Sequence, residues 1–145
     1  MIFLNKNNKI LTYGGHKNMF FSQDYYNSPE LCDNESVLGC CFNKESFLFI
    51  TVCLKKIKLW NMFNGKLQKN YDNFFINNTG EITAFCTDKQ INRVFIGDSW
   101  GYTYSISVAN GKVLNTYIKH DTEISNVYLC SNHNFFISIS NDGCI

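Results

Sequence analysis

The chain has 145 residues, of which 45% are hydrophobic and 16% aromatic, so it is long enough for one globular domain with a substantial core. Thirteen basic residues against twelve acidic ones leave a net charge of +1, which gives no field to gather nucleic acid or an anionic membrane, and we expect neither as a partner. The seven cysteines form no Cys-x-x-Cys pair and favour a reducing compartment, the cytoplasm.

β-Branched and aromatic residues dominate every apolar segment, and polar or glycine-containing breaks separate the segments. No window has the periodicity of a helix, so the pattern predicts an all-β fold. Residues 1–36 are interpreted as a degenerate partial repeat and a linker. The strands predicted after them lie near residues 37–42, 47–53, 56–61, 66–71, 82–87, 93–97, 102–107, 112–117, 124–129 and 135–140.

The predicted strands repeat. First strands begin at Val37, Ile82 and Ile124, which are 45 and 42 residues apart, and Asn-Gly turn pairs stand at 64–65 and 110–111. Residues 37–71 and 82–117 each hold four strands, and residues 124–145 form an incomplete unit. A period of about 40–45 residues with four strands per unit indicates a β-propeller blade. Residues 1–145 are therefore predicted to be one fragment of a β-propeller, with about three four-stranded antiparallel blades plus a partial one, completed by the remainder of the propeller beyond residue 145.

The units resemble the WD-repeat family. Trp60 and the asparagine after it stand in the Trp-Asp position, His120 precedes Ile124 by four residues, and "SNDG" at 140–143 occupies the turn between second and third strands. In that family a histidine, a serine or threonine, an aspartate and a tryptophan form a hydrogen-bonded network within a blade. The resemblance implies that His120, Ser140 and Asp142 are three of the four in the last unit.

The two preceding units depart from this pattern. Leu54 stands in the aspartate position of the unit that contains Trp60, and in the next unit Trp100 and Ile106 stand in the aspartate and tryptophan positions. The resemblance therefore predicts no such network in those two blades, which must be held by packing and strand pairing.

A narrower resemblance concerns residues 80–114. The Glu-Ile-Thr that opens this unit at Glu81 and the Ile-Gly-Asp before its turn are similar to blades of WD-repeat proteins in ciliary and flagellar axonemes. This resemblance implies partners among axonemal or cytoskeletal proteins, and a place in a cilium, a flagellum or the cytoskeleton.

Sequence signals for an enzyme are weak. The three histidines lack a partner at metal-ligand spacing, and neither a nucleophile elbow nor a phosphate-binding glycine loop occurs. Asp98 and Asp142 stand at predicted tight turns, where aspartate caps its own backbone. We therefore expect no catalytic residue, no cofactor and no metal.

The predicted function is a non-catalytic scaffold that binds other proteins through loops on one face of the blades, at residues 72–81, 98–101, 118–123 and 141–143. An exposed apolar patch of aromatic residues is predicted there, rimmed by polar ones. The patch comprises Phe74, Phe75 and Trp100, and its rim comprises Asn77, Asn78 and Glu81. That Trp100 folds back over its own blade remains an alternative. The competing function is a small-ligand-binding or hydrolytic domain with a site in the propeller channel.

Overall fold

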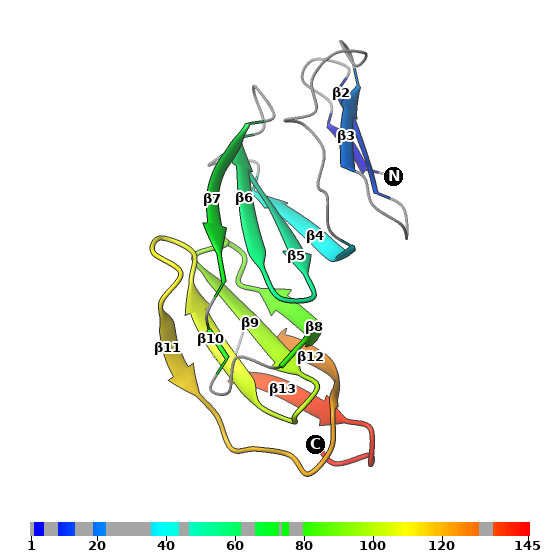
Figure 1. Cartoon of the computed structure of the whole chain (residues 1–145), viewed down its shortest axis with the longest axis vertical. Coiled ribbons are helices and arrows are strands. Elements are labelled where there is room, and N and C mark those ends of the chain that lie inside the picture. Colours follow the sequence, from blue (N-terminus) through cyan, green and yellow to red (C-terminus); the bar gives the residue numbers. More distant parts are fainter. Residues whose placement is uncertain are drawn as a thin grey trace.

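The computed structural model describes residues 2–4, 9–13, 19–22, 36–43, 47–61, 66–72, 74–75, 80–130 and 135–145. Within these ranges the chain forms thirteen strands and no helix (Figure 1). The many β-branched and aromatic residues favour this outcome because their side chains pack well on a pleated surface.

The strands form four antiparallel sheets. A three-stranded sheet has the order β1-β2-β3, with β1 at Ile2–Leu4, β2 at Lys9–Tyr13 and β3 at Met19–Ser22. The first blade has the order β4-β5-β6-β7, with β4 at Val37–Asn43, β5 at Leu48–Cys53, β6 at Ile57–Asn61 and β7 at Leu67–Tyr71. The second blade has the order β11-β10-β9-β8, with β8 at Ile82–Thr87, β9 at Arg93–Asp98, β10 at Thr103–Ser107 and β11 at Val113–Thr116. The third blade pairs β12 at Ile124–Cys130 with β13 at Phe135–Ser140.

The predicted strands from residue 37 onward are confirmed, and each observed end lies within one residue of the expected one. The repeat also extends to the register of pairing. Val37 pairs with Cys53, Ile82 with Asp98 and Ile124 with Ser140, and in each blade the register shifts directly after that pair. The three blades therefore share a bulge at the start of the first strand, a feature that strengthens local twist.

The first seam, which we define as the contact between the first and second blades, is filled by large apolar side chains. Ile50, Val52 and Leu59 of the first blade pack with residues of β8, β9 and β10, and all of these side chains are buried. The second blade contributes Ile82, Val94, Ile96, Tyr104 and Ile106 to this cluster. Alternation along β5, β6, β9 and β10 directs these residues to one face of each sheet.

The second seam, between the second and third blades, is built differently. β12 lies beside β8 (Figure 1), and the Thr83 hydroxyl donates a hydrogen bond to the Ile124 carbonyl at 2.5 Å. A Cβ atom added at Gly97 would lie 2.6 Å from Cβ of Ile124, so only glycine allows this approach. The Phe136 ring packs against Phe95 in a tilted arrangement and against Tyr117 edge to face, with ring centroids 5.3 and 4.3 Å apart. This seam is close at the backbone, and its apolar cluster is smaller than that of the first seam, with four buried members: Ala84, Phe95, Ile124 and Val127.

Candidate protein-binding surface

The connections between the blades lie next to the turns between second and third strands, and a series of hydrogen bonds joins them. The Ile82 N–H donates to the Leu54 carbonyl at 2.6 Å, and the Ser99 N–H donates to the Glu81 carbonyl at 3.0 Å. The His120 N–H donates to the Gly101 carbonyl at 3.0 Å. We name the continuous surface formed by residues 54–56, 80–81, 98–102, 118–123 and 140–144 the turn surface.

The turn at 98–102 is fixed from inside by Asp98, a carboxylate that is only 1% exposed. One carboxylate oxygen accepts the N–H groups of Trp100 and Tyr102 at 2.9 and 2.8 Å, and the other accepts the Tyr104 hydroxyl at 3.0 Å. Because a buried charge is costly unless its oxygens are hydrogen-bonded, these three bonds explain how an aspartate can stand there. The turn therefore presents Trp100 on a rigid backbone.

The turn at 140–144 has the same backbone geometry. The Ser140 N–H donates to the Cys144 carbonyl at 3.0 Å, as the Asp98 N–H does to the Tyr102 carbonyl at 2.9 Å. Gly143 has a φ of +83°, close to the +87° of Gly101, and glycine adopts this conformation without steric cost. The Ser140 hydroxyl and the Cys144 N–H both donate to Asp142, and these bonds lower the pKa of its carboxyl.

The network expected for the third blade is only partly present. Ser140 and Asp142 are joined, but His120 Nε2 contacts the Ser138 hydroxyl at 2.8 Å, and not Ser140. Ser138 stands two residues before the turn, where Thr51 stands in the first blade. The sequence thus predicted Ser140 as the partner of His120, whereas the observed partner is Ser138, two residues earlier. Thr51 stands at the same distance before the turn of the first blade, and this spacing is the signal that would have located Ser138.

The absence of any such network in the first blade was also predicted, and that prediction is wrong in part. The Trp60 indole Nε1–H donates to the Thr51 hydroxyl at 2.9 Å, and both residues are buried. Leu54 stands in the turn and has no carboxylate to extend the contact. Two members of the expected set therefore remain in this blade.

The predicted exposed patch is wrong for two of its three aromatic residues. Phe74 and Phe75 are 4% and 9% exposed and belong to the core of the first seam. The Phe75 ring packs against Phe74 and Tyr104, with centroid separations of 4.9 and 6.3 Å. The two rings therefore fill space in the core between the two blades. Asn77 and Asn78 lie outside the described residues.

Trp100 and Glu81, in contrast, are exposed as expected. The Trp100 side chain is 53% exposed, so it does not fold back over its own blade. Two further apolar side chains of the turn surface are exposed, Leu54 at 40% and Ile118 at 93%, and the sequence reasoning missed both. Ile118 stands in the polar segment "YIKHDTE", and an isolated apolar residue in such a segment was the available signal.

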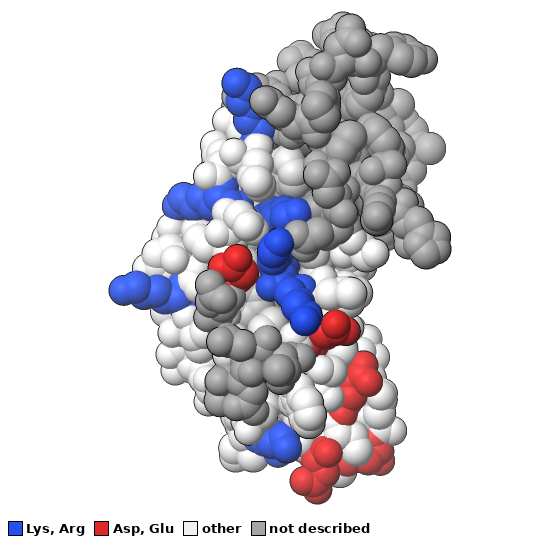
Figure 2. All heavy atoms as spheres, viewed as in Figure 1, with Lys and Arg blue, Asp and Glu red and all other residues white. Residues whose placement is uncertain are grey.

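Carboxylates are frequent on the turn surface that carries Trp100. Glu81, Asp121, Glu123 and Asp142 are all exposed. Two lysines stand among them: the Lys55 ammonium lies 4.0 Å from the Glu81 carboxylate, and the Lys119 ammonium lies 5.4 Å from the centre of the Tyr102 ring. Figure 2 shows acidic side chains gathered along the lower right margin of the molecule and basic ones mainly above and to the left.

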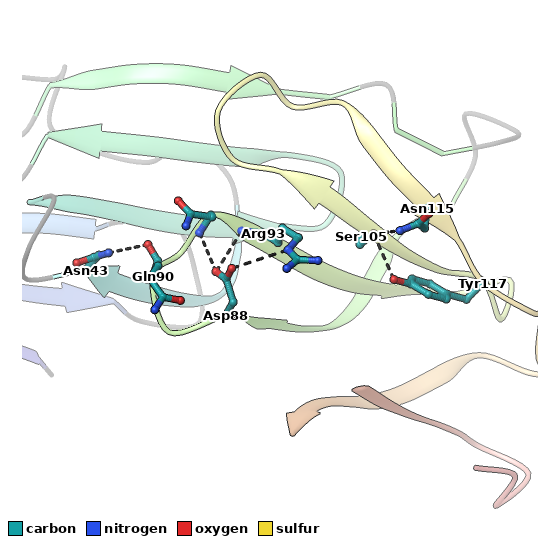
Figure 3. A network of polar contacts seen from close by, with 8 residues as sticks. Asn43, Asp88, Gln90, Arg93, Ser105, Asn115 and Tyr117 are labelled. Carbon is teal, nitrogen blue, oxygen red and sulfur yellow. Dashed lines mark hydrogen bonds and ion pairs between the residues drawn. The ribbon is translucent and has the colours of Figure 1, made fainter. Parts of the chain in front are cut away.

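Polar residues at the other ends of the strands close turns. The Asn43 amide donates to the Gln90 carbonyl at 2.6 Å, which ties the end of β4 to the β8–β9 turn (Figure 3). Asp88 accepts the N–H groups of Asn92 and Arg93 at 2.7 and 3.1 Å, and the Arg93 Nε lies 4.0 Å from its carboxylate. These polar groups therefore stabilise turns and the contact between the two blades.

Chemically reactive groups are few on the described part of the chain. Burial raises the pKa of the Cys41 and Cys86 thiols to about 11, so both are protonated near neutral pH. No set of three or more histidine, cysteine and carboxylate side chains among the described residues is arranged to hold a metal ion. The same residues contain no helix with the length and apolar character needed to cross a bilayer.

Comparisons with known proteins agree with this architecture. No protein-family model matches the sequence. The chain is 30% identical over 135 residues to cilia- and flagella-associated protein 337 B of Tetrahymena thermophila, an alignment that covers 93% of this chain but spans only 10% of that protein. Its structure is similar to the β-propeller domain of Cps50 (Swd1) from Myceliophteria thermophila, with a TM-score of 0.58 and 10% identity, over 72% of this chain and 32% of that one. The chain is thus an all-β protein with the fold of a β-propeller fragment.

Proposed function

We propose that the chain is a non-catalytic part of a protein-interaction scaffold and that it binds partner proteins through the turn surface. The observation that carries the proposal is Trp100, a half-exposed tryptophan on a turn whose backbone Asp98 fixes from inside. Tryptophan is one of the residue types enriched among the side chains that contribute most to binding at protein interfaces. A rigid anchor also loses little conformational freedom on binding.

The setting we propose is the cytoplasm, in a cilium, a flagellum or another cytoskeletal assembly, with axonemal or cytoskeletal proteins as partners. Two findings support it: the propeller fold, and the similarity to a protein named for its association with cilia and flagella. The chain spans about a tenth of that relative, so the setting is proposed for the region that the two share.

Site-specific photo-crosslinking tests this function. A photoreactive phenylalanine derivative would replace Trp100 in a tagged chain expressed in ciliated cells, and in a second chain it would replace Leu114. Leu114 is 48% exposed on β11 and lies outside the turn surface, so it is a matched control. We expect crosslinks to a structural protein of the cilium from position 100 and none from position 114. Equal crosslinking from both positions, or crosslinking from position 114 alone, would contradict the proposal.

A further inference from the structure

The turn that carries Trp100 lies between the turn that contains Leu54 and the connection at 118–123. On one side, the Ile82 N–H donates to the Leu54 carbonyl, and the Ser99 N–H donates to the Glu81 carbonyl. Residues 81–82 therefore connect the turn that contains Trp100 to the turn that contains the exposed Leu54 side chain. On the other side, Gly101 contacts the connection at 118–123, because a Cβ atom added at Gly101 would lie 2.7 Å from the Thr122 carbonyl oxygen. Asp121 and Glu123 therefore stand next to the turn that carries Trp100.

The charges of the two sides differ. Glu81, near Leu54, already has Lys55 beside it at 4.0 Å. On the far side, the Asn141 N–H donates to the Glu123 carbonyl at 2.9 Å and the Asp142 N–H donates to the Thr122 hydroxyl at 3.2 Å, which brings a third carboxylate to Asp121 and Glu123. Lys119, the basic residue of this connection, is placed over the Tyr102 ring. Negative charge is therefore concentrated on the side of the third blade.

We propose that the turn surface binds a basic segment of a partner protein, with an arginine side chain stacked on Trp100 and further basic residues facing Asp121 and Glu123. This inference rests on the proposed function and adds the chemistry of the partner. A guanidinium is attracted to the face of an indole ring, and the attraction is larger for tryptophan than for the other aromatic residues. Carboxylates on the connection next to this turn favour the same cation and disfavour acidic segments. Leu54 offers a contact for an apolar residue of the segment on the opposite side.

Two fluorescein-labelled peptides of ten residues would test the inference. One has arginine and glycine in alternation with a leucine near one end, and the other has glutamate in place of every arginine. Fluorescence anisotropy would measure their dissociation constants with the full chain at about 50 and about 300 mM NaCl, concentrations between which screening of exposed charges increases strongly. We expect the arginine peptide to bind, more weakly at the higher salt concentration, and the glutamate peptide not to bind.

Three variants separate the two parts of the surface. Trp100→Ala should weaken binding about tenfold, and Trp100→Phe should restore part of the loss because a ring remains. The double variant Asp121→Asn with Glu123→Gln should weaken binding about fivefold at low salt and much less at high salt. Asp72→Asn removes an exposed carboxylate outside the turn surface and should change the dissociation constant less than about twofold.

The outcomes distinguish this inference from the proposed function. Binding of both peptides, or an equal loss in Asp72→Asn and in Asp121→Asn with Glu123→Gln, would mean non-specific attraction and would overturn the inference. Failure of the arginine peptide together with successful crosslinking from position 100 would also overturn it, while the scaffold function would stand. Specific binding of the arginine peptide without any crosslink in cells would support the chemistry of the surface and contradict the ciliary function.

Discussion

The two seams of the molecule solve the same packing problem with different residues. At the first seam, β5 and β6 present Ile50, Val52 and Leu59 to the second blade, and the space between the sheets is filled by large side chains. At the second seam, the equivalent faces of β9 and β10 present Phe95 to an apolar cluster with Ile124 and Val127. The other residues of these faces are small or polar and yet buried: Gly97, Thr103 and Ser105. The third blade therefore approaches much closer at the backbone.

This difference shows that blade stacking does not require one conserved type of interface. The first seam depends on buried apolar area, which is non-directional and tolerates changes of shape if volume is kept. The second seam depends on a close approach at Gly97, on stacking of Phe136 and on the hydrogen bond from Thr83 to Ile124. We expect the first seam to be sensitive to loss of volume and the second to gain of volume.

The largest effect should come from emptying the first seam. Phe75→Ala removes a ring that is 9% exposed and packed against Phe74 and Tyr104, and we expect it to lower the free energy of unfolding by about 3–5 kcal/mol. Trp100→Ala is the matched control, because that side chain is half exposed and its loss should change stability by less than about 1 kcal/mol. Urea denaturation followed by circular dichroism measures both. Similar losses in the two variants would contradict the assignment of Phe75 to the core.

A smaller loss is expected from filling the second seam. Gly97→Ala places a methyl group 2.6 Å from Cβ of Ile124 and should cost about 1–3 kcal/mol, because the third blade must move away. Combining it with Ile124→Ala, which keeps Cβ but removes the Cγ1 and Cγ2 atoms that are also in contact, should recover part of that cost, and a double-mutant cycle would measure the coupling. Gly143→Ala is the control without a steric contact: nothing lies within 4 Å of its added methyl group, and only the positive φ opposes the change. Additive losses at positions 97 and 124 would argue against the close approach.

Two buried threonines allow a finer comparison of the blades. Thr51 accepts the hydrogen bond of Trp60, whereas the Thr103 hydroxyl is buried without a hydrogen-bond partner among the described residues, and both threonines are 0% exposed. Thr51→Val should therefore cost about 1 kcal/mol or more by leaving the indole N–H unpaired, while Thr103→Val should be neutral or stabilise by up to about 1 kcal/mol. Thermal unfolding of the two variants and the unchanged protein measures both stability changes. A destabilised Thr103→Val protein would mean that the hydroxyl has a partner.

The smallest expected effect concerns pH and the turn at 140–144. The pKa of Asp142 lies below its usual value of 3.8, chiefly because the Ser140 hydroxyl and then the Cys144 N–H donate hydrogen bonds to its carboxylate. A group with a lowered pKa in the folded state stabilises above its unfolded pKa, and this contribution disappears as the pH falls through the folded value. The turn should thus keep its hydrogen bonds at about pH 4 and lose them only in stronger acid. Amide chemical shifts of residues 142 and 144 in an NMR titration would show the midpoint, and a value at or above 3.8 would be inconsistent with these hydrogen bonds.

Much of the fold could be predicted because a strand has a characteristic local pattern of residue types in the sequence. Alternating β-branched and aromatic residues, broken by turn residues, located every strand from Val37 onward. The same reasoning placed Trp100 at a turn, since Asp98 and Gly101 around it are turn formers. These features depend on residues within a few positions of each other.

The wrong predictions concern residues whose role depends on contacts between blades, or residues whose position was counted across turns of unequal length. Phe74 and Phe75 lie in a polar connection, and only the stacking of two sheets shows that their rings fill a space in the core. Ser138 was overlooked because its role is defined by its distance from the turn. That turn, closed by Ser140 and Cys144, is one residue longer than the turn closed by Cys53 and Lys56. The exposure of Ile118 depends on the path of the connection at 118–123. A connection has no periodic sequence pattern from which exposure could be predicted.

One consequence of the Asp98 contacts concerns the order of folding. All three hydrogen bonds to its carboxylate come from Trp100, Tyr102 and Tyr104, so the β9–β10 hairpin contains its own closing contacts within seven residues. Contacts of short sequence separation need little loop closure and form early. We expect this hairpin to act as a nucleus on which β8, and then the neighbouring blades, assemble. Pulse-labelled hydrogen exchange during refolding should show protection at residues 100 and 102 before protection at 124, and the reverse order would exclude such a nucleus.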